Sequence, residues 1–433
     1  MLAPTIIFTA VYVLIAFNLL DKTAAAMLGA VMVVGLHLVP YKVALASIDL
    51  NVLLLLIGMM TIMGILATTG FIEWMAVVIA QRARGNGPVI MVLFLFVTAF
   101  TSAFLDNVTT VILIAPITIL ITQILEVPTA PVLIMEAIFS NIGGTATLIG
   151  DPPNIIIGSS TYLTFTDFIF NLTPVVVVIA LVCVAIFYRR AGAMMKAAPE
   201  TRDRILKAVP RLAITDLGRI KRGLPVLGLT ILGFFLSRPL DIEPGIIAIG
   251  GAMIMIVVCR IDIHTALERI EWNTILFFIG LFMTISALEY NGVFQKAGTG
   301  ILEITRGNLF LTVIVILWLS AITSAIVDNI PLVIAMLPLI QSIVPTFANP
   351  LGLDPASEAA TASITEPLLW ALALGACLGG NGTLVGASAN VVIAQIGHRN
   401  RCEITFWDFT KQGLPMMIAS VAVATIYLWL RYF

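Results

Sequence analysis

Charged residues are what this sequence has least of. Only 11 % of its 433 residues are Asp, Glu, Lys or Arg, whereas 60 % are hydrophobic and the mean hydropathy is +1.08. A soluble globular chain carries about 25 % charged residues, so the composition excludes an ordinary soluble domain. We expect a protein whose solvent is lipid.

Several kinds of chemistry are missing as well. The four cysteines (Cys183, Cys259, Cys377 and Cys402) have no short spacing and form neither a disulfide framework nor a zinc motif. The chain contains no His-Glu-x-x-His, no Gly-x-Ser-x-Gly and no Walker motif. We therefore expect no enzyme, no cofactor and no resident metal, and ATP could enter only through a separate partner subunit.

What the sequence does contain is a series of apolar segments long enough to cross a membrane. The first half predicts spans near 4–20, 23–40 and 50–68, an amphipathic piece at 70–84, a split pair at 88–104 and 108–125, an interrupted segment at 130–164 and a span at 170–188. The second half predicts spans near 223–238, 244–259 and 272–289, an amphipathic piece at 292–305, a split pair at 309–325 and 329–345, an interrupted segment at 366–397 and a span at 414–431.

The two halves also repeat each other residue by residue. One offset of 222 residues relates Ser102, Asp106, Asn107 and Pro116 to Ser324, Asp328, Asn329 and Pro338. An offset of 236 relates Gly143-Gly144 through Asn154 to Gly379-Gly380 through Asn390, and an insertion of 14 residues around 349–365 accounts for the change. Chance similarity does not easily keep paired glycines and Asp-Asn pairs in register. We predict an internal repeat.

This repeat leads to a topology. If each split pair is a re-entrant hairpin and each amphipathic piece lies on the surface, each half crosses five times and the halves are inverted. The fold class is then an all-α polytopic membrane protein with about ten membrane helices plus two hairpins. We divide it into a first repeat (1–188), a basic cytoplasmic linker (189–222) and a second repeat (223–433). Placing the linker inside puts 18 of the 23 Lys and Arg residues on the cytoplasmic side of a cell's inner membrane and both termini outside.

The hairpin turns carry Asp106-Asn107 and Asp328-Asn329. A carboxylate inside the bilayer costs about 3 kcal/mol on insertion scales and is a functional candidate by default. Capping of the following helix is the alternative role, and it is compatible with function. We predict that Asp106 and Asp328 bind and release a coupling proton.

The interrupted segments cannot be continuous helices, because proline removes a donor and clashes with the preceding turn. Two broken helices in matching positions indicate a binding site at the membrane midplane, and kinks that only aid packing are the alternative. The predicted substrate-binding residues are Asn107, Thr109, Thr110, Gly144, Thr145, Thr147, Asp151, Asn154, Ser324, Asn329, Asn381, Thr383 and Asn390.

No Lys or Arg lies within the hairpins or the broken segments. This absence favours a neutral polyhydroxy solute or a cation over a di- or tricarboxylate, which needs positive charge. Four glutamates at or near span ends are expected to reach the membrane interface: Glu136, Glu271, Glu289 and Glu366.

Residues 102–110, 141–154 and 379–390 resemble the ArsB/NhaD family of the ion transporter superfamily, which includes arsenite permeases, sodium/proton antiporters and the melanosomal P protein. The resemblance covers nearly the whole chain, and its motifs are specific for the superfamily but not for a substrate. It implies a scaffold domain for dimerisation, a transport domain of hairpins and broken helices, and an elevator-type alternating-access cycle. Related dicarboxylate transporters carry Ser-Asn-Thr at the hairpin tips, whereas this chain has Asp106-Asn107-Val108-Thr109 and Asp328-Asn329-Ile330-Pro331, so the two half-sites are not equivalent.

The sequence and the resemblance together predict a secondary transporter that exports arsenite or antimonite in exchange for protons. A sodium/proton antiporter and an anion exporter of the same superfamily stay open as alternatives. A simple channel is not excluded by the sequence, although the inverted repeat with paired hairpins favours alternating access. The expected partners are arsenite or antimonite, protons and the lipid bilayer. A homodimer and a separate ATPase subunit are compatible with the sequence, and nothing indicates nucleic acid.

Overall fold

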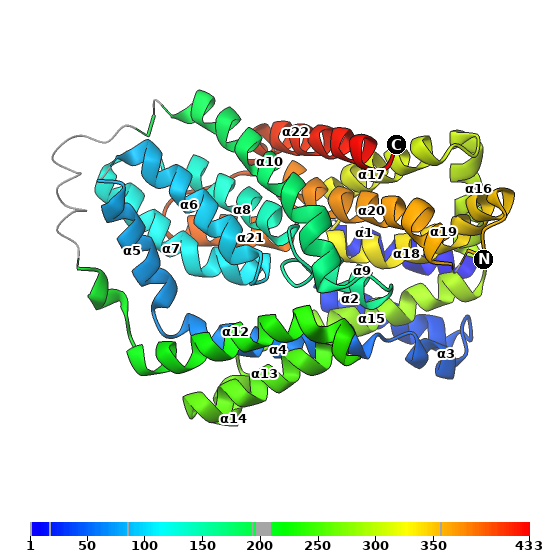
Figure 1. Ribbon diagram of the computed structural model, residues 1–433, viewed down its shortest axis with the longest axis horizontal. Coiled ribbons are helices and arrows are strands. Elements are labelled where there is room, and N and C mark those ends of the chain that lie inside the picture. The colour runs from blue at the N-terminus through cyan, green and yellow to red at the C-terminus, as the bar shows by residue number, and fades with distance from the viewer. Residues whose placement is uncertain (1, 17–18, 85, 193, 196–208, 356) are drawn as a thin grey trace.

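The structure, a computed structural model, describes residues 2–16, 19–84, 86–192, 194–195, 209–355 and 357–433. In these ranges it consists of helices without a strand (Figure 1). Nine of the described helices are long and apolar enough to cross a membrane. The predicted class, an all-α polytopic membrane protein, is confirmed. Four basic residues of the predicted linker lie outside the described residues: Lys196, Arg202, Arg204 and Lys207.

The first half contains α1 (Leu2–Ala16), α2 (Lys22–Gly35), α3 (Tyr41–Ala46), α4 (Leu50–Ala67), α5 (Phe71–Arg82), α6 (Gly87–Ser102), α7 (Asn107–Leu125), α8 (Ala130–Gly144), α9 (Pro152–Ser159) and α10 (Phe165–Ala191). The second half contains η1 (Pro210–Ala213), α12 (Leu217–Leu240), α13 (Pro244–Cys259), α14 (Ile263–Leu267), α15 (Trp272–Tyr290), α16 (Val293–Thr305), α17 (Leu309–Ile326), α18 (Asn329–Ala348), η2 (Asn349–Leu351), α19 (Glu358–Ala360), η3 (Thr361–Thr365), α20 (Glu366–Gly379), η4 (Gly380–Gly382), α21 (Ser388–Arg399) and α22 (Phe406–Tyr432).

Several boundaries differ from the hydropathy prediction. Helix α10 begins at Phe165 rather than near 170, and α22 begins at Phe406 rather than near 414. In both cases a threonine before the helix forms a capping box with the aspartate three residues on, Thr164 with Asp167 and Thr405 with Asp408. Such caps satisfy free amides at the helix start, so polar residues belong to helices that hydropathy alone shortens.

Helices α2, α4, α12, α13 and α15 form one layer, here called the scaffold layer, in which α2 packs on α15 and α4 and α12 pack on α13. In Figure 1, α12, α4, α13 and α14 lie along the lower edge of the molecule. The crossings are very close: a Cβ on Gly58 would lie 2.4 Å from the carbonyl carbon of Ala248, and one on Gly280 would lie 2.7 Å from that of Ala26. Small residues permit such contacts between membrane helices. These two contacts are related by the offset of 222.

The second layer, here called the hairpin layer, contains the helix pairs α6–α7 and α17–α18 and the broken pairs α8–α9 and α20–α21. Helix α6 packs on α8, and α17 packs on α20. A Cβ on Gly143 would lie 2.1 Å from the Ala99 oxygen, and one on Gly379 would lie 2.4 Å from the Ala321 oxygen. The paired glycines of the motif therefore let each hairpin touch the broken helix of its own half. The insertion within the second half, around 349–365, forms η2, α19 and η3.

Candidate functional site

The two hairpin tips and the first helix break meet the scaffold layer around one cavity of about 300 Å³. Hairpin tips and breaks place their polar groups here because the chain reverses or unwinds at these points. The polar residues that line the cavity are Lys22, Asp106, Asn107, Asp151, Glu271, Asn273, Thr274, Asp328, Asn329 and Ser388. Five of the predicted site residues therefore lie together at this cavity, although they are spread over both repeats of the chain: Asp106, Asn107, Asp151, Asp328 and Asn329.

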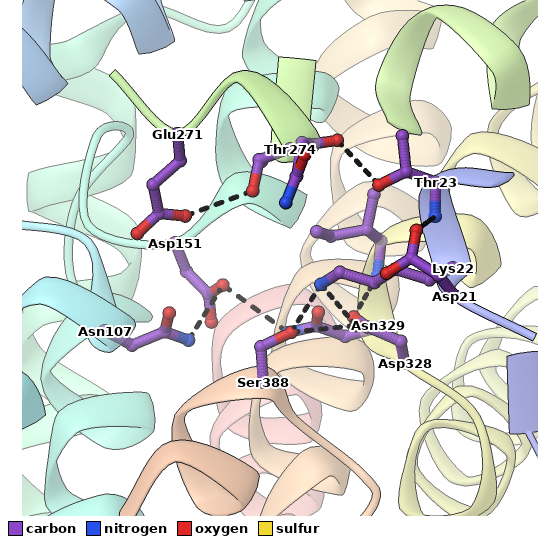
Figure 2. Close-up of polar contacts among 12 residues, drawn as sticks. Asp21, Lys22, Thr23, Asn107, Asp151, Glu271, Thr274, Asp328, Asn329 and Ser388 are labelled. Carbon is purple, nitrogen blue, oxygen red and sulfur yellow. Dashed lines mark hydrogen bonds and ion pairs between the residues drawn. The ribbon is translucent and has the colours of Figure 1, made fainter. Parts of the chain in front are cut away.

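Asp151 lies at the centre of this site, and its side chain is completely buried. Its Oδ1 accepts hydrogen bonds from Asn107 Nδ2 and Asn329 Nδ2, each at 3.4 Å, so one amide comes from each hairpin tip (Figure 2). Its Oδ2 is buried without a hydrogen-bond partner in the described part of the chain. A buried oxygen without a partner is costly, so this atom is suited to receive a proton or a donor from a bound solute.

Asp328 is held from two directions. Its Oδ2 accepts from Ser388 Oγ at 3.0 Å and lies 3.7 Å from Lys22 Nζ, and Lys22 Nζ also donates to Ser388 Oγ at 2.9 Å (Figure 2). Ser388 begins α21 in the hairpin layer, whereas Lys22 begins α2 in the scaffold layer. The hairpins and the broken segments themselves contain no Lys or Arg, as the sequence shows. The site as a whole is nevertheless not free of positive charge, because α2 brings a lysine into it.

Asp106 is satisfied within its own hairpin. Its Oδ1 accepts from the Thr109 amide at 2.8 Å, and its Oδ2 accepts from the Thr109 hydroxyl at 2.5 Å. This is the N-cap arrangement for α7. Capping and a position in the cavity therefore coexist at this residue.

Glu271 also faces the cavity, at the start of α15. Its Oε2 accepts from the Thr274 hydroxyl at 3.1 Å. Neither Glu271 nor Lys22 was among the predicted site residues. Both come from the scaffold layer, which the repeat motifs do not mark. Glu136 is a further correction, because it is completely buried with the Thr118 hydroxyl on its Oε1 instead of reaching the membrane interface.

Side-chain amides next to the cavity-lining Asn107 form hydrogen bonds between the two halves of the chain. Asn141 Oδ1 accepts from Asn107 at 3.1 Å, while Asn141 Nδ2 donates to Asn381 Oδ1 at 3.0 Å and to Asn390 Oδ1 at 3.1 Å. Asn141 belongs to the first repeat and the last two residues to the second. Sequence reasoning did not select Asn141, although it opens the Asn-Ile-Gly-Gly segment.

The other predicted substrate-binding residues hold the broken backbone together. The Asn154 amide donates to the carbonyls of Gly144, Thr145 and Thr147, and the Asn390 amide donates to those of Gly380 and Thr383. The hydroxyls of Thr145, Thr147, Ser324 and Thr383 also donate to carbonyls, and the Thr110 hydroxyl is buried without a partner among the described residues. None of these residues lines the cavity, and their contact with a solute stays a prediction.

The geometry of the site does not favour the binding of a metal ion. Within the described ranges, no group of three or more His, Cys, Asp or Glu side chains could hold a metal ion. Cys377 lies outside the cavity lining, where its thiol donates to Asn154 Oδ1 at 3.6 Å. The site offers carboxylates, amides, a hydroxyl and one ammonium group, which suits proton binding and hydrogen bonding to a small polar solute.

Comparisons with known proteins agree with this architecture. A family model described as citrate transporter (CitMHS) matches residues 12–375. An uncharacterized transporter of Mycobacterium tuberculosis is 42 % identical over 431 residues, which cover 99 % of this chain and 97 % of the relative. The human P protein is 31 % identical over 512 residues and is covered over 59 % of its length. The crystal structure of the Alcanivorax borkumensis YdaH transporter superposes with a TM-score of 0.58 over 89 % of this chain and 85 % of its own, at 13 % identity.

Proposed function

Because the chain belongs to the citrate transporter family, CitMHS, and is a secondary transporter of the ion transporter superfamily, we propose that it exchanges its solute for protons by an elevator-type cycle. The observation that carries this proposal is the environment of Asp151. One carboxyl oxygen accepts an amide from each hairpin, and the other is buried without a partner among the described residues. A single group thus lies between both moving tips.

Coupling follows if proton and solute compete for this group. A proton on Asp151 Oδ2 neutralises a buried charge and satisfies the atom. A solute hydroxyl that donates to the same oxygen makes the proton unnecessary. Each ligand then lowers the affinity for the other, and this mutual exclusion is what exchange requires.

For the solute, we propose arsenite or antimonite. The undissociated acid is uncharged at neutral pH and carries three hydroxyl donors. The cavity offers acceptors for them in Asp106, Asp151, Glu271 and Asp328. An anion would meet four carboxyl groups and one lysine, and that lysine is already paired with Asp328.

A second candidate is an organic anion such as citrate. Lys22 in the cavity and the description of the family favour it. Sodium, the alternative kept from the sequence, needs several oxygen ligands together. The backbone carbonyls at the first break, which would supply ligands besides the carboxylates, already accept the Asn154 amide.

The proposal includes an orientation. We propose that the linker 189–222 is cytoplasmic, that both termini lie outside the inner membrane and that the repeats 1–188 and 223–433 are inverted. Helices α2 and α15 then begin at the cytoplasmic side. Lys22, the first residue of α2, and Glu271, which directly precedes α15, line the cavity, so the present state is inward-facing in this orientation. The site's movement to the other side is the transport step.

The test is reconstitution in liposomes with a trapped pH dye and an imposed proton gradient. Arsenite, antimonite, sodium chloride and sodium citrate are added separately, and potassium chloride serves as the blank. Proton flux triggered by arsenite or antimonite and not by the other salts supports the proposal. Flux with every sodium salt selects sodium/proton antiport, and flux with citrate alone selects the anion.

A further inference from the structure

The two hairpin carboxylates obtain their partners from different layers. Asp106 is satisfied by Thr109 of its own hairpin, at 2.5 Å for the hydroxyl. Asp328 receives Ser388 from the hairpin layer and Lys22 from the scaffold layer, at 3.0 and 3.7 Å. Movement of one layer against the other therefore leaves the Asp106 contacts intact and breaks the ion pair between Lys22 and Asp328.

The sequence shows why the arrangement is one-sided. The offset of 222 takes Lys22 to Pro244 and Thr109 to Pro331, and the offset of 236 takes Ser388 back to Pro152. Each group that satisfies one carboxylate is thus a proline at the matching position of the other repeat. Proline offers neither a charge nor a donor. Lys22 has no counterpart in the second half.

A second cavity, of about 320 Å³, lies between the layers and is lined by Asp49, Phe282 and Ile334, among others. These three residues match Glu271, Met60 and Ile112, which line the site cavity, at the same offset of 222. The space between the layers therefore has two ends, and corresponding residues of the two repeats line them. The hairpin tips occupy the end that has Lys22 and Glu271. The other end presents Asp49 and has proline at the position of the lysine.

We propose that Lys22 is a counter-ion present at one end only, that it holds ionised Asp328 in the state seen here, and that the hairpin layer leaves this state when Asp328 takes up a proton. The inference rests on the proposed function, in which the hairpin layer moves between the two ends. At the opposite end an ionised Asp328 would face Asp49 and Glu289, and no Lys or Arg is among the described residues that line that cavity. Lys22 thus makes movement of the site conditional on protonation.

The direction of the pH effect follows from the charges around Asp328. The charged or titratable groups that face it are Asp21 and Lys22 of α2, Tyr12 of α1, Asp106 of the first hairpin, Asp151 of the first break and Glu271 of α15. Lys22 is the one cation among these described neighbours. Ionised Asp328 is stabilised by it in this state only. Rising pH should therefore populate the present state, and falling pH should release the hairpin layer.

The experiment measures the distance between the layers in the full-length protein in lipid nanodiscs. Spin labels are placed on the double variant Ile263→Cys and Trp407→Cys, whose native side chains are exposed. Ile263 lies on α14, which packs on α4 of the scaffold layer, and Trp407 lies at the start of α22, which packs on α17 and α20 of the hairpin layer. Cys402→Ser removes the one native thiol that is not buried. Double electron–electron resonance then gives the populations of the two states between acidic and mildly alkaline pH.

In the labelled protein we expect the population ratio of the two states to change by about tenfold over this range, a usual size for coupled sites. Lys22→Gln should remove the change, and Lys22→Arg should keep it. Lys42→Gln, a lysine of the scaffold side that is exposed on α3, should behave like the parent. A Lys22→Gln protein with the full pH dependence of the parent overturns the inference.

The double variant Lys22→Gln with Asp328→Asn removes both charges and covers the case in which the single variant does not fold. It should show populations that do not depend on the charge of Asp328, equal to those of Asp328→Asn alone. If this double variant retains the parent's pH dependence, the role of the ion pair is contradicted, but the movement of the hairpin layer is not. One fixed distance in every protein and at every pH contradicts the elevator cycle itself.

Discussion

Asn141 Nδ2 donates to Asn390 Oδ1 at 3.1 Å, so a side-chain amide of the first broken helix is bonded to the second. The repeat-related contact is made by Cys377, whose thiol donates to Asn154 Oδ1 at 3.6 Å. The offset of 236 relates Asn141 to Cys377 and Asn154 to Asn390. At these repeat-related positions the breaks are thus joined on one side by an amide and on the other by the weaker thiol donor.

This relationship predicts a large effect of Asn141→Ala on stability. The variant leaves the buried oxygens of Asn381 and Asn390 without the Asn141 donor, and an unpartnered buried group costs about 1–3 kcal/mol. We expect a clear fall in the melting temperature of the purified protein, measured by scanning fluorimetry in detergent. Asn400→Ala, at an exposed helix end, is the control. Equal melting temperatures for both variants would show that the connection between the breaks carries no stability.

Asp151→Asn should separate binding from coupling. The asparagine has the same shape, can keep its carbonyl oxygen towards the two hairpin amides and cannot carry the proton that the proposed exchange requires. Proton flux in liposomes should fall to background, while solute counterflow at equal pH on both sides persists at a reduced rate, because the amide nitrogen at the Oδ2 position cannot accept the solute hydroxyl. Asp262→Asn, in an exposed turn before α14, should leave both assays unchanged. Full proton flux in Asp151→Asn would remove this residue from the mechanism.

Glu136 offers a test of whether every buried carboxyl group takes part. Its Oε1 accepts from the Thr118 hydroxyl, its Oε2 has no partner among the described residues, and it does not line the site cavity. Glu136→Gln retains the contact with Thr118 and removes the ionisable group. We therefore expect normal proton-coupled flux and unchanged or higher stability at alkaline pH, because no buried charge can form. Loss of proton coupling would instead place Glu136 on the path of the proton.

The close crossings of the scaffold layer predict sensitivity to a single methyl group. Gly58→Ala and Gly280→Ala would place a Cβ within 2.4 and 2.7 Å of the facing backbone. The helices must then separate, and overpacking of this kind typically costs about 1–3 kcal/mol. Gly228→Ala is the matched control, since no atom lies within 4 Å of the position that its new methyl group would take. We expect lower folded yield for the first two variants only, measured by gel filtration in detergent.

Much of the site can be predicted from local features of the chain. Asp106 and Asp328 each lie between two apolar runs, so a turn at those residues was predictable. Asp151 precedes a Pro pair that no helix interior tolerates. These residues line the cavity because breaks and turns are local properties of the backbone.

Lys22 and Glu271 could not be identified in this way. Each lies at the start of a scaffold helix, and a charged residue at such a position looks in the sequence like any other charged residue at the end of a loop. Their place in the site depends on which end of the scaffold layer the hairpin tips approach. Hydropathy contains no information about that packing. The position that matches Lys22 is a proline, Pro244, whereas the one that matches Glu271 is another carboxylate, Asp49.

The order of the helices, the repeat and the two breaks follow from the sequence alone, because a bilayer requires long apolar segments and backbone breaks require glycine and proline. The pairing of Asp328 with a lysine about 300 residues earlier was decided only by tertiary structure. Two layers must pack before a long side chain of one can reach a hairpin tip of the other. The chain therefore specifies the carboxylates of its site locally, whereas their counter-ion depends on how the layers are placed.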